Sequence, residues 1–110
     1  MLVLLDQNVP IGVRRILSGH DVRTAYGMGW ANLSNGELMN ASETGGVQVL
    51  VTCDQNIVFQ QSLAQRRIAV VVLMTNRWAV IRTDSQRIED AVTAATPGSF
   101  TIIRYDRSNI

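Results

Sequence analysis

The stretch IAVVVLM, residues 68–74, is the longest uninterrupted apolar run in this chain of 110 residues. A valine-rich run of this length matches a β-strand and falls far short of the roughly 20 residues that cross a membrane as a helix. Because no polar residues alternate with the apolar ones, the run predicts a strand of a parallel sheet that is covered on both faces. Residues 2–5 and 47–52 are shorter strand-like runs, and acids follow them at Asp6 and Asp54.

Segments with helical spacing separate the strand-like runs. Strands are expected over residues 2–5, 21–25, 47–52, 68–74 and 100–104, and helices over residues 9–17, 34–43, 56–67 and from about 85 to Pro97. Asn8 is expected to cap the first helix, and Ser34 and Glu37 have the spacing of a capping box. The alternation predicts one domain over residues 1–110: a three-layer, Rossmann-like α/β/α fold with a five-stranded, mostly parallel sheet of order near 2-1-3-4-5.

Composition narrows the function classes. The chain has ten arginines, nine acids and no lysine, for a net charge of +1, which argues against a protein that coats DNA. Without lysine, only the N-terminus could supply an amine for Schiff-base chemistry, and no P-loop lysine exists. Cys53 is the single cysteine and the apolar runs are short, so we expect a cytoplasmic protein without a disulfide or a membrane partner.

Acids follow two of the strands that this sheet order makes neighbours. In open α/β sheets the binding crevice lies beyond the carboxyl ends of the strands, where the strand order reverses. Asp6 and Asp54 end the first and third strands there, and Glu37 begins the second helix nearby. Paired carboxylates of this kind suit a hard divalent cation, Mg²⁺ or Mn²⁺. Four amide side chains close to these acids in the sequence are candidates to add ligands or hold waters: Gln7, Asn8, Asn35 and Asn56.

Each of these residues also has a purely structural interpretation. Asp54 and Asn56 could only cap the helix that follows them, and Glu37 could only complete the capping box with Ser34. The metal interpretation depends on two strand-end aspartates coinciding at the expected crevice.

A series of motifs, taken in order, resembles the small PIN-like proteins, which are compact relatives of the PIN-domain nucleases. The motifs are LLDQNVP (residues 4–10), GH (19–20), MGW (28–30), NGEL (35–38), VTCDQN (51–56) and QQSLAQRRIAVVVL (60–73). The resemblance covers roughly residues 2–76 and is weaker beyond them.

The resemblance implies a metal-dependent endoribonuclease, often the toxin of a toxin–antitoxin pair. Asp6 would correspond to the first-strand aspartate of the family, Glu37 to its helix acid and Asp54 to its later strand-end aspartate. One or two Mg²⁺ or Mn²⁺ ions would orient a water and neutralise charge on the phosphate. The implied partners are RNA, an antitoxin protein and a second copy in a homodimer.

Two departures from the family pattern bear on activity. The position after Asp6 is often glutamate in these relatives and is Gln7 in this chain. A fourth acid is usual, and Asp84 matches too weakly to be assigned to it. Because a missing negative ligand weakens cation binding, a weakened or inactive nuclease is left open.

The sequence is also compatible with two other functions. A receiver-like phosphoacceptor domain would use Asp54, Asp6 and Thr75, but such domains need a paired acidic motif and a lysine, which are missing. A non-catalytic binding or assembly module on the same fold would use exposed aromatic and methionine side chains, with these candidates: Met28, Trp30, Phe59 and Trp78.

Four arginines are either solvated ends of helices or contacts for RNA phosphates: Arg14, Arg15, Arg66 and Arg67.

Overall fold

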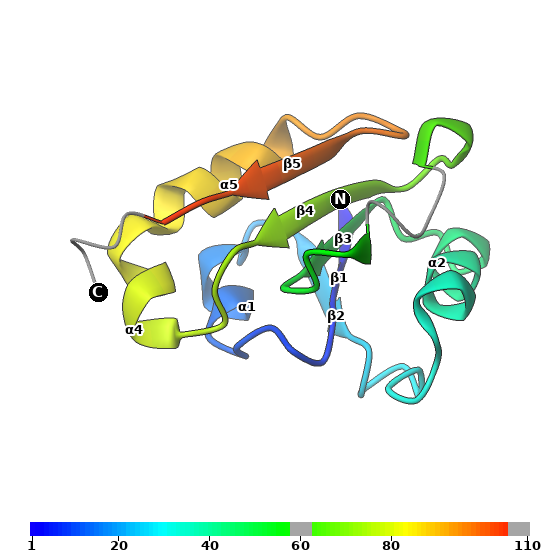
Figure 1. Cartoon of the computed structure of the whole chain (residues 1–110), viewed down its shortest axis with the longest axis horizontal. Coiled ribbons are helices and arrows are strands. Elements are labelled where there is room, and N and C mark those ends of the chain that lie inside the picture. Colours follow the sequence, from blue (N-terminus) through cyan, green and yellow to red (C-terminus); the bar gives the residue numbers. More distant parts are fainter. Residues whose placement is uncertain (58–62, 106–110) are drawn as a thin grey trace.

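The five predicted strands form one sheet, which is parallel throughout. The computed structural model describes residues 1–57 and 63–105. The strands are β1 (Leu2–Leu5), β2 (Asp21–Thr24), β3 (Val49–Thr52), β4 (Ala69–Leu73) and β5 (Phe100–Ile103). Their order is β2-β1-β3-β4-β5, which confirms the predicted order (Figure 1). β1 lies between β2 and β3, with Leu5 paired to Thr24 on one side and to Val51 on the other.

Helices cover both faces of the sheet, so the α/β layers are those expected of a Rossmann-like arrangement (Figure 1). The helices are α1 (Val13–Ile16), α2 (Asn35–Thr44), α4 (Trp78–Ile81) and α5 (Ser85–Thr93), with 3-10 turns η1 (Leu63–Gln65) and η2 (Arg82–Asp84). α2 lies on one face, and α1, α4 and α5 lie on the other.

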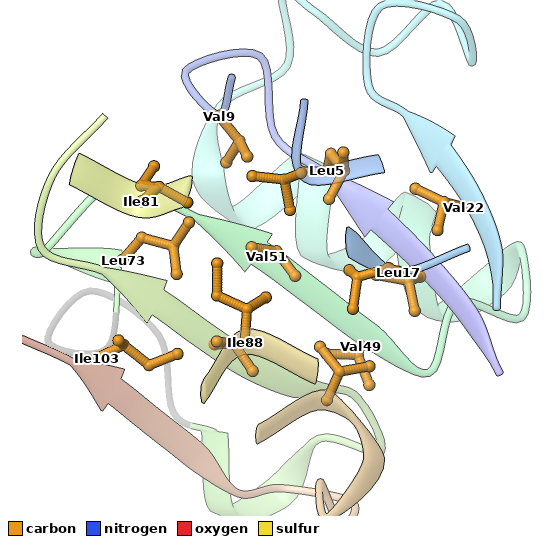
Figure 2. Close-up of a cluster of buried hydrophobic side chains, with 14 of the residues drawn as sticks. Leu5, Val9, Leu17, Val22, Val49, Val51, Leu73, Ile81, Ile88 and Ile103 are labelled. Carbon is orange, nitrogen blue, oxygen red and sulfur yellow. The ribbon is translucent and has the colours of Figure 1, made fainter. Parts of the chain in front are cut away.

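Two hydrophobic clusters hold the layers together. Successive residues of a strand point to opposite faces, so Leu5 and Val51 join the cluster under α1, α4 and α5, together with Ile88 (Figure 2). Leu4 and Leu50 join the cluster under α2. Because the central strands are buried on both faces, the valine-rich runs of the sequence are explained.

The two clearest helix predictions are confirmed. α2 begins with the expected capping box, in which the side chains of Ser34 and Glu37 each accept from the backbone N–H of the other. α5 begins at Ser85 and buries Ile88 and Val92, as the spacing predicted. The helix expected over residues 56–67 lies largely outside the described residues, which contain only η1 at its end.

The predicted first helix is wrong in its length and in its cap. The helix begins after Gly12, and the Asn8 side chain instead accepts a hydrogen bond from the Cys53 backbone N–H at 3.1 Å. Before α1 the chain forms tight turns, in which the N–H of Val13 bonds the carbonyl of Pro10 three residues earlier. The side of the first helix that was predicted to be buried is confirmed, because Val13 and Leu17 are fully buried.

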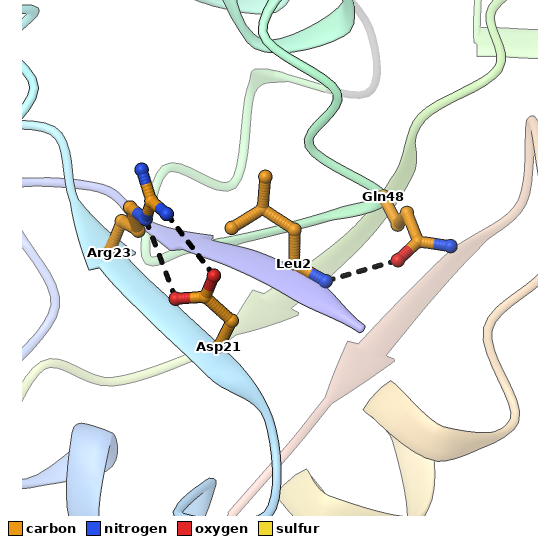
Figure 3. Close-up of polar contacts among 4 residues, drawn as sticks. All are labelled: Leu2, Asp21, Arg23 and Gln48. Atoms are coloured by element: carbon orange, nitrogen blue, oxygen red, sulfur yellow. Dashed lines mark hydrogen bonds and ion pairs between the residues drawn. The ribbon is translucent and has the colours of Figure 1, made fainter.

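One edge of the sheet carries charge. Asp21 and Arg23 of β2 form an exposed ion pair at 3.2 Å (Figure 3). Charged side chains on an edge strand discourage pairing with a second sheet. On the other side of β1, the Leu2 N–H donates to Gln48 Oε1 at 3.0 Å (Figure 3).

Within residues 1–57 and 63–105, no helix combines the length and the hydropathy that crossing a membrane needs.

Candidate functional site

Asp6 and Asp54 follow neighbouring strands, at the side of the sheet where the carboxyl ends of all five parallel strands lie. The Asp6 N–H donates to the Val51 carbonyl at 2.9 Å, which extends the β1–β3 pairing one residue past β1. Asp54 lies two residues after the end of β3. Because β1 and β3 are paired and parallel, the two aspartates leave the sheet at the same edge, as the strand order predicted.

A buried threonine connects the two aspartates. The Thr52 side chain, which is 0% exposed, donates its hydroxyl hydrogen to Asp6 Oδ2 at 2.8 Å. The Thr52 hydroxyl oxygen in turn accepts a hydrogen bond from the Asp54 N–H at 3.1 Å. A hydroxyl has one hydrogen to donate and two lone pairs, so this geometry fixes the side chain of one aspartate relative to the backbone of the other.

Neutral donors hold the remaining carboxylate oxygens. Asp6 Oδ1 accepts from the Gln7 N–H at 2.8 Å. Asp54 Oδ1 accepts from the Asn56 N–H at 2.9 Å, and Asp54 Oδ2 accepts from the Asn35 amide at 2.8 Å. Among the described residues, every ion pair involves other acids. Hydrogen bonds therefore orient the two carboxylates, and within residues 1–57 and 63–105 no arginine forms an ion pair with either of them.

The second helix brings Asn35 to this site, and Glu37 is engaged elsewhere. Glu37 Oε1 accepts from the Ser34 N–H at 3.0 Å. Hydrogen bonds with the Ser34 backbone, and to a lesser extent with its side chain, lower the pKa of Glu37. At 3.6 residues per turn, side chains two positions apart point about 200° apart around a helix axis. Since Asn35 points to Asp54, Glu37 lies on a different side of α2.

The carboxylate oxygens of Asp6 and Asp54 suit a metal ion that keeps most of its coordinated waters. The described part of the chain holds no group of three or more acidic, histidine or cysteine side chains close enough to share one metal ion. Mg²⁺ in proteins is commonly held by one or two carboxylates, with waters and substrate phosphates completing the shell. Each carboxylate oxygen has a second lone-pair direction beyond the hydrogen bond described, so Asp6 and Asp54 fit such an ion.

Cys53 is a partly buried neighbour of this site. Its thiol donates to the Thr75 carbonyl at 3.3 Å. Burial, with a smaller effect from the charge of Asp6, raises the pKa of Cys53 from 9.0 to about 11. Because the thiolate is the nucleophilic form, the raised pKa and the burial argue against a nucleophilic role for Cys53.

Two open pockets flank the aspartates along the edge of the sheet. The Tyr26 pocket, of about 320 Å³, lies on the β2 side and is lined by Leu5, Asp6, Gln7, Val9, Ile11, Thr24 and Tyr26. The Arg77 pocket, also about 320 Å³, lies beyond β3 and β4 and is lined by Cys53, Gln55, Met74, Thr75, Asn76 and Arg77. The aspartates thus lie between a partly aromatic pocket and a basic one.

Arg66 and Arg67 lie away from the ends of β1 and β3, whereas Arg14 lies closer to the carboxyl ends of the strands, in a hollow that it shares with Thr24 and Gly27. Arg66 forms an ion pair with Glu43 at 2.6 Å, and the Arg67 N–H bonds the same carboxylate. Both precede β4, whose five residues span about 17 Å at 3.3–3.4 Å each, so they lie near the opposite edge. Arg14 and Arg15 line a hollow beside the start of β2. Sequence reasoning missed Arg77, although its position shortly after β4 is a signal of the same kind as Asp6.

Most of the aromatic and methionine candidates for an interface are packed. Met28 and Trp30 contact the cluster under α2. Trp78 is 38% exposed and packs on Gly12, where an added Cβ would lie 2.6 Å from the indole ring. Phe59 lies outside the described residues.

No family model matches the chain, and no curated protein or solved structure shows significant similarity to it.

Proposed function

We propose that Asp6 and Asp54 bind one divalent cation, Mg²⁺ or Mn²⁺, and that the protein hydrolyses RNA phosphodiesters there, as the PIN-like resemblance implies. The observation that carries this proposal is the Thr52 hydroxyl, which joins Asp6 at 2.8 Å to the backbone of Asp54 at 3.1 Å. Roles as a toxin, with an antitoxin partner or in a homodimer, follow from the resemblance alone and stay predictions.

The charge of the aspartate pair supports a cation. Hydrogen bonds from Thr52, Asn35 and backbone N–H groups orient the carboxylates without neutralising them. Neighbouring carboxylates repel each other unless a proton or a cation lies between them. Outer hydrogen bonds of this kind typically hold metal ligands in place, and losing one reduces metal affinity about 10- to 100-fold.

The residues have separable roles in the proposed reaction. A bound cation would lower the pKa of a coordinated water and offset the charge that develops on the phosphate. Asp6 and Asp54 would hold that cation, while Thr52 and Asn35 would keep their carboxylates in place. Gln7 stands where a second first-strand acid is common in PIN-like proteins, so we expect weak cation binding and slow turnover.

Calorimetric titration with Mg²⁺ and Mn²⁺ tests the site directly. We expect wild-type protein to bind one cation, and Asp6→Asn and Asp54→Asn each to abolish the binding. Asp90→Asn is a matched control, because Asp90 is an exposed acid of α5 that bonds Gln86. RNA cleavage should require the same cation and should be lost in both site variants.

Glu37→Gln separates a two-acid site from a three-acid site. Glutamine also completes a capping box, so the variant should fold. If Asp6 and Asp54 suffice, Glu37→Gln should leave the cation affinity nearly unchanged, whereas a large loss would assign Glu37 as a third ligand. Wild-type protein that binds neither cation would refute the proposed function.

A further inference from the structure

The two most exposed large apolar side chains of the described residues line the same pocket. Tyr26 is 82% exposed and Ile11 is 66% exposed, and both lie at the Tyr26 pocket. Buried Leu5 and Val9 also line it, and so does Asp6. Exposed apolar side chains gathered at a hollow with a few polar groups are typical of a ligand site.

An ordered turn holds the tyrosine. The Gly27 N–H donates to Thr24 Oγ1 at 2.9 Å, and the Gly29 N–H donates to the Tyr26 carbonyl at 3.1 Å. A Cβ on Gly27 would lie 2.9 Å from that hydroxyl oxygen, so glycine is needed for the turn as it stands. Met28 packs against the cluster under α2 and anchors the turn to the core. The exposed ring is therefore displayed from fixed backbone.

The lining of the pocket suits a flat heterocycle. An aromatic ring offers a stacking face, and Ile11 adds an aliphatic surface beside it. The exposed Gln7 carries an amide that both donates and accepts, which is the chemistry needed to bond the edge of an unpaired base. A volume of about 320 Å³ lies at the lower end of the range for ligand pockets and suits one base-sized group.

We propose that the Tyr26 pocket binds one unpaired nucleobase of the RNA strand whose phosphate faces Asp6 and Asp54. This inference rests on the proposed function, because Asp6 belongs both to the pocket and to the cation site. A base held on the β2 side keeps the adjoining phosphate next to the ends of β1 and β3. A protein partner is less well matched, since an ordinary interface covers about 800 Å² on each side.

A neutral nucleoside tests the pocket without the cation site. The protein is titrated with 2-aminopurine riboside in EDTA, so that neither a phosphate nor a metal ion contributes. We expect shifts of the Tyr26 ring and Ile11 methyl resonances, and quenching of the nucleoside fluorescence by stacking. Tyr26→Ala should weaken binding about tenfold or more, and Tyr26→Phe should retain it. Phe100→Ala is the matched control, because Phe100 is 52% exposed on β5, and it should change nothing.

Cation calorimetry on the same variants separates the two proposals. Tyr26→Ala should bind the cation as wild type does, whereas Asp6→Asn should not. Nucleoside binding without cation binding would support the base pocket and refute the hydrolytic function. Cation binding with no effect of the nucleoside on Tyr26 and Ile11 would overturn the base pocket alone. Shifts of these resonances with protein concentration, before nucleoside is added, would also overturn it, because a second copy would then cover the pocket.

Discussion

Replacing Thr52 by valine should separate the hydrogen-bonding role of this residue from its packing role. Valine has nearly the shape of threonine, but it lacks the hydroxyl that donates to Asp6 and accepts from the Asp54 N–H. Thr52→Ser makes the complementary change, because it keeps the hydroxyl and removes a buried methyl group. The two variants therefore isolate two contributions from one fully buried side chain.

The expected losses differ in size. A hydrogen bond to a charged group contributes about 1.5–3 kcal/mol, and a buried donor left without a partner costs about 1–3 kcal/mol. Asp54 is only partly buried, so its N–H should contribute near the low end of the second range. Thr52→Val should thus lower the free energy of unfolding by about 2.5–4 kcal/mol. Thr52→Ser should lower it by only about 1 kcal/mol, the value of one buried methyl group.

Urea unfolding at neutral pH measures both variants against wild type. A second readout is cation affinity, which Thr52→Val should reduce about 10- to 100-fold and Thr52→Ser should leave nearly unchanged. A Thr52→Val protein as stable as Thr52→Ser would refute the reasoning, since the hydroxyl would then contribute no more than a methyl group. Normal cation affinity in Thr52→Val would show that the aspartates do not depend on this bond.

Three other side chains outside this network lead to separate predictions. Arg66, 2.6 Å from Glu43, lowers the pKa of Glu43 below its ordinary 4.5. The stabilisation is therefore complete above that value and is lost as the pH falls through the lower pKa of the folded state. Glu43→Gln should be less stable than wild type at neutral pH but not in strong acid, and a difference independent of pH would contradict this. The pKa of about 11 makes the Cys53 thiolate about 100-fold scarcer than at 9.0, and the greater nucleophilicity of a more basic thiolate offsets part of this. A thiol reagent should therefore modify native protein at least about tenfold more slowly than unfolded protein, and equal rates would be inconsistent with the raised pKa. Arg77→Ala should weaken binding of single-stranded RNA and lower its salt dependence by about one counterion, whereas Arg67→Ala should change neither; equal effects would place the RNA elsewhere.

Most of the sheet could be predicted because its signals are local. Continuous apolar runs mark the buried parallel strands, and their alternation with helices favours a doubly wound sheet, for which 2-1-3-4-5 is a common strand order. The adjacency of Asp6 and Asp54 needs only that order, so it was available from the sequence. The capping box of Ser34 and Glu37 is local as well, and it formed as predicted.

The details that were wrong or missed depend on long-range contacts. Asparagine is a residue type that often caps helices, but the side-chain oxygen of Asn8 accepts a hydrogen bond from the backbone N–H of Cys53, 45 residues away. Thr52 is an ordinary β-branched strand residue until the register of β1 and β3 puts its hydroxyl against Asp6. The exposure of Tyr26 likewise follows from the turn that carries it, and the spacing of apolar residues in the sequence does not predict this exposure.

The arginines of this chain bear on whether the strand-end aspartates are structural. A buried or partly buried acid that serves stability is normally paired with a cation of the protein itself. In the described residues the ion pairs join arginines to Asp21, Glu43 and Asp84, and they leave out Asp6 and Asp54. The two carboxylates are one strand apart, and the donors that bond them in the described part of the chain are neutral, so we expect the balancing charge to come from solution. A divalent cation supplies it to both carboxylates at once, which a single proton does not.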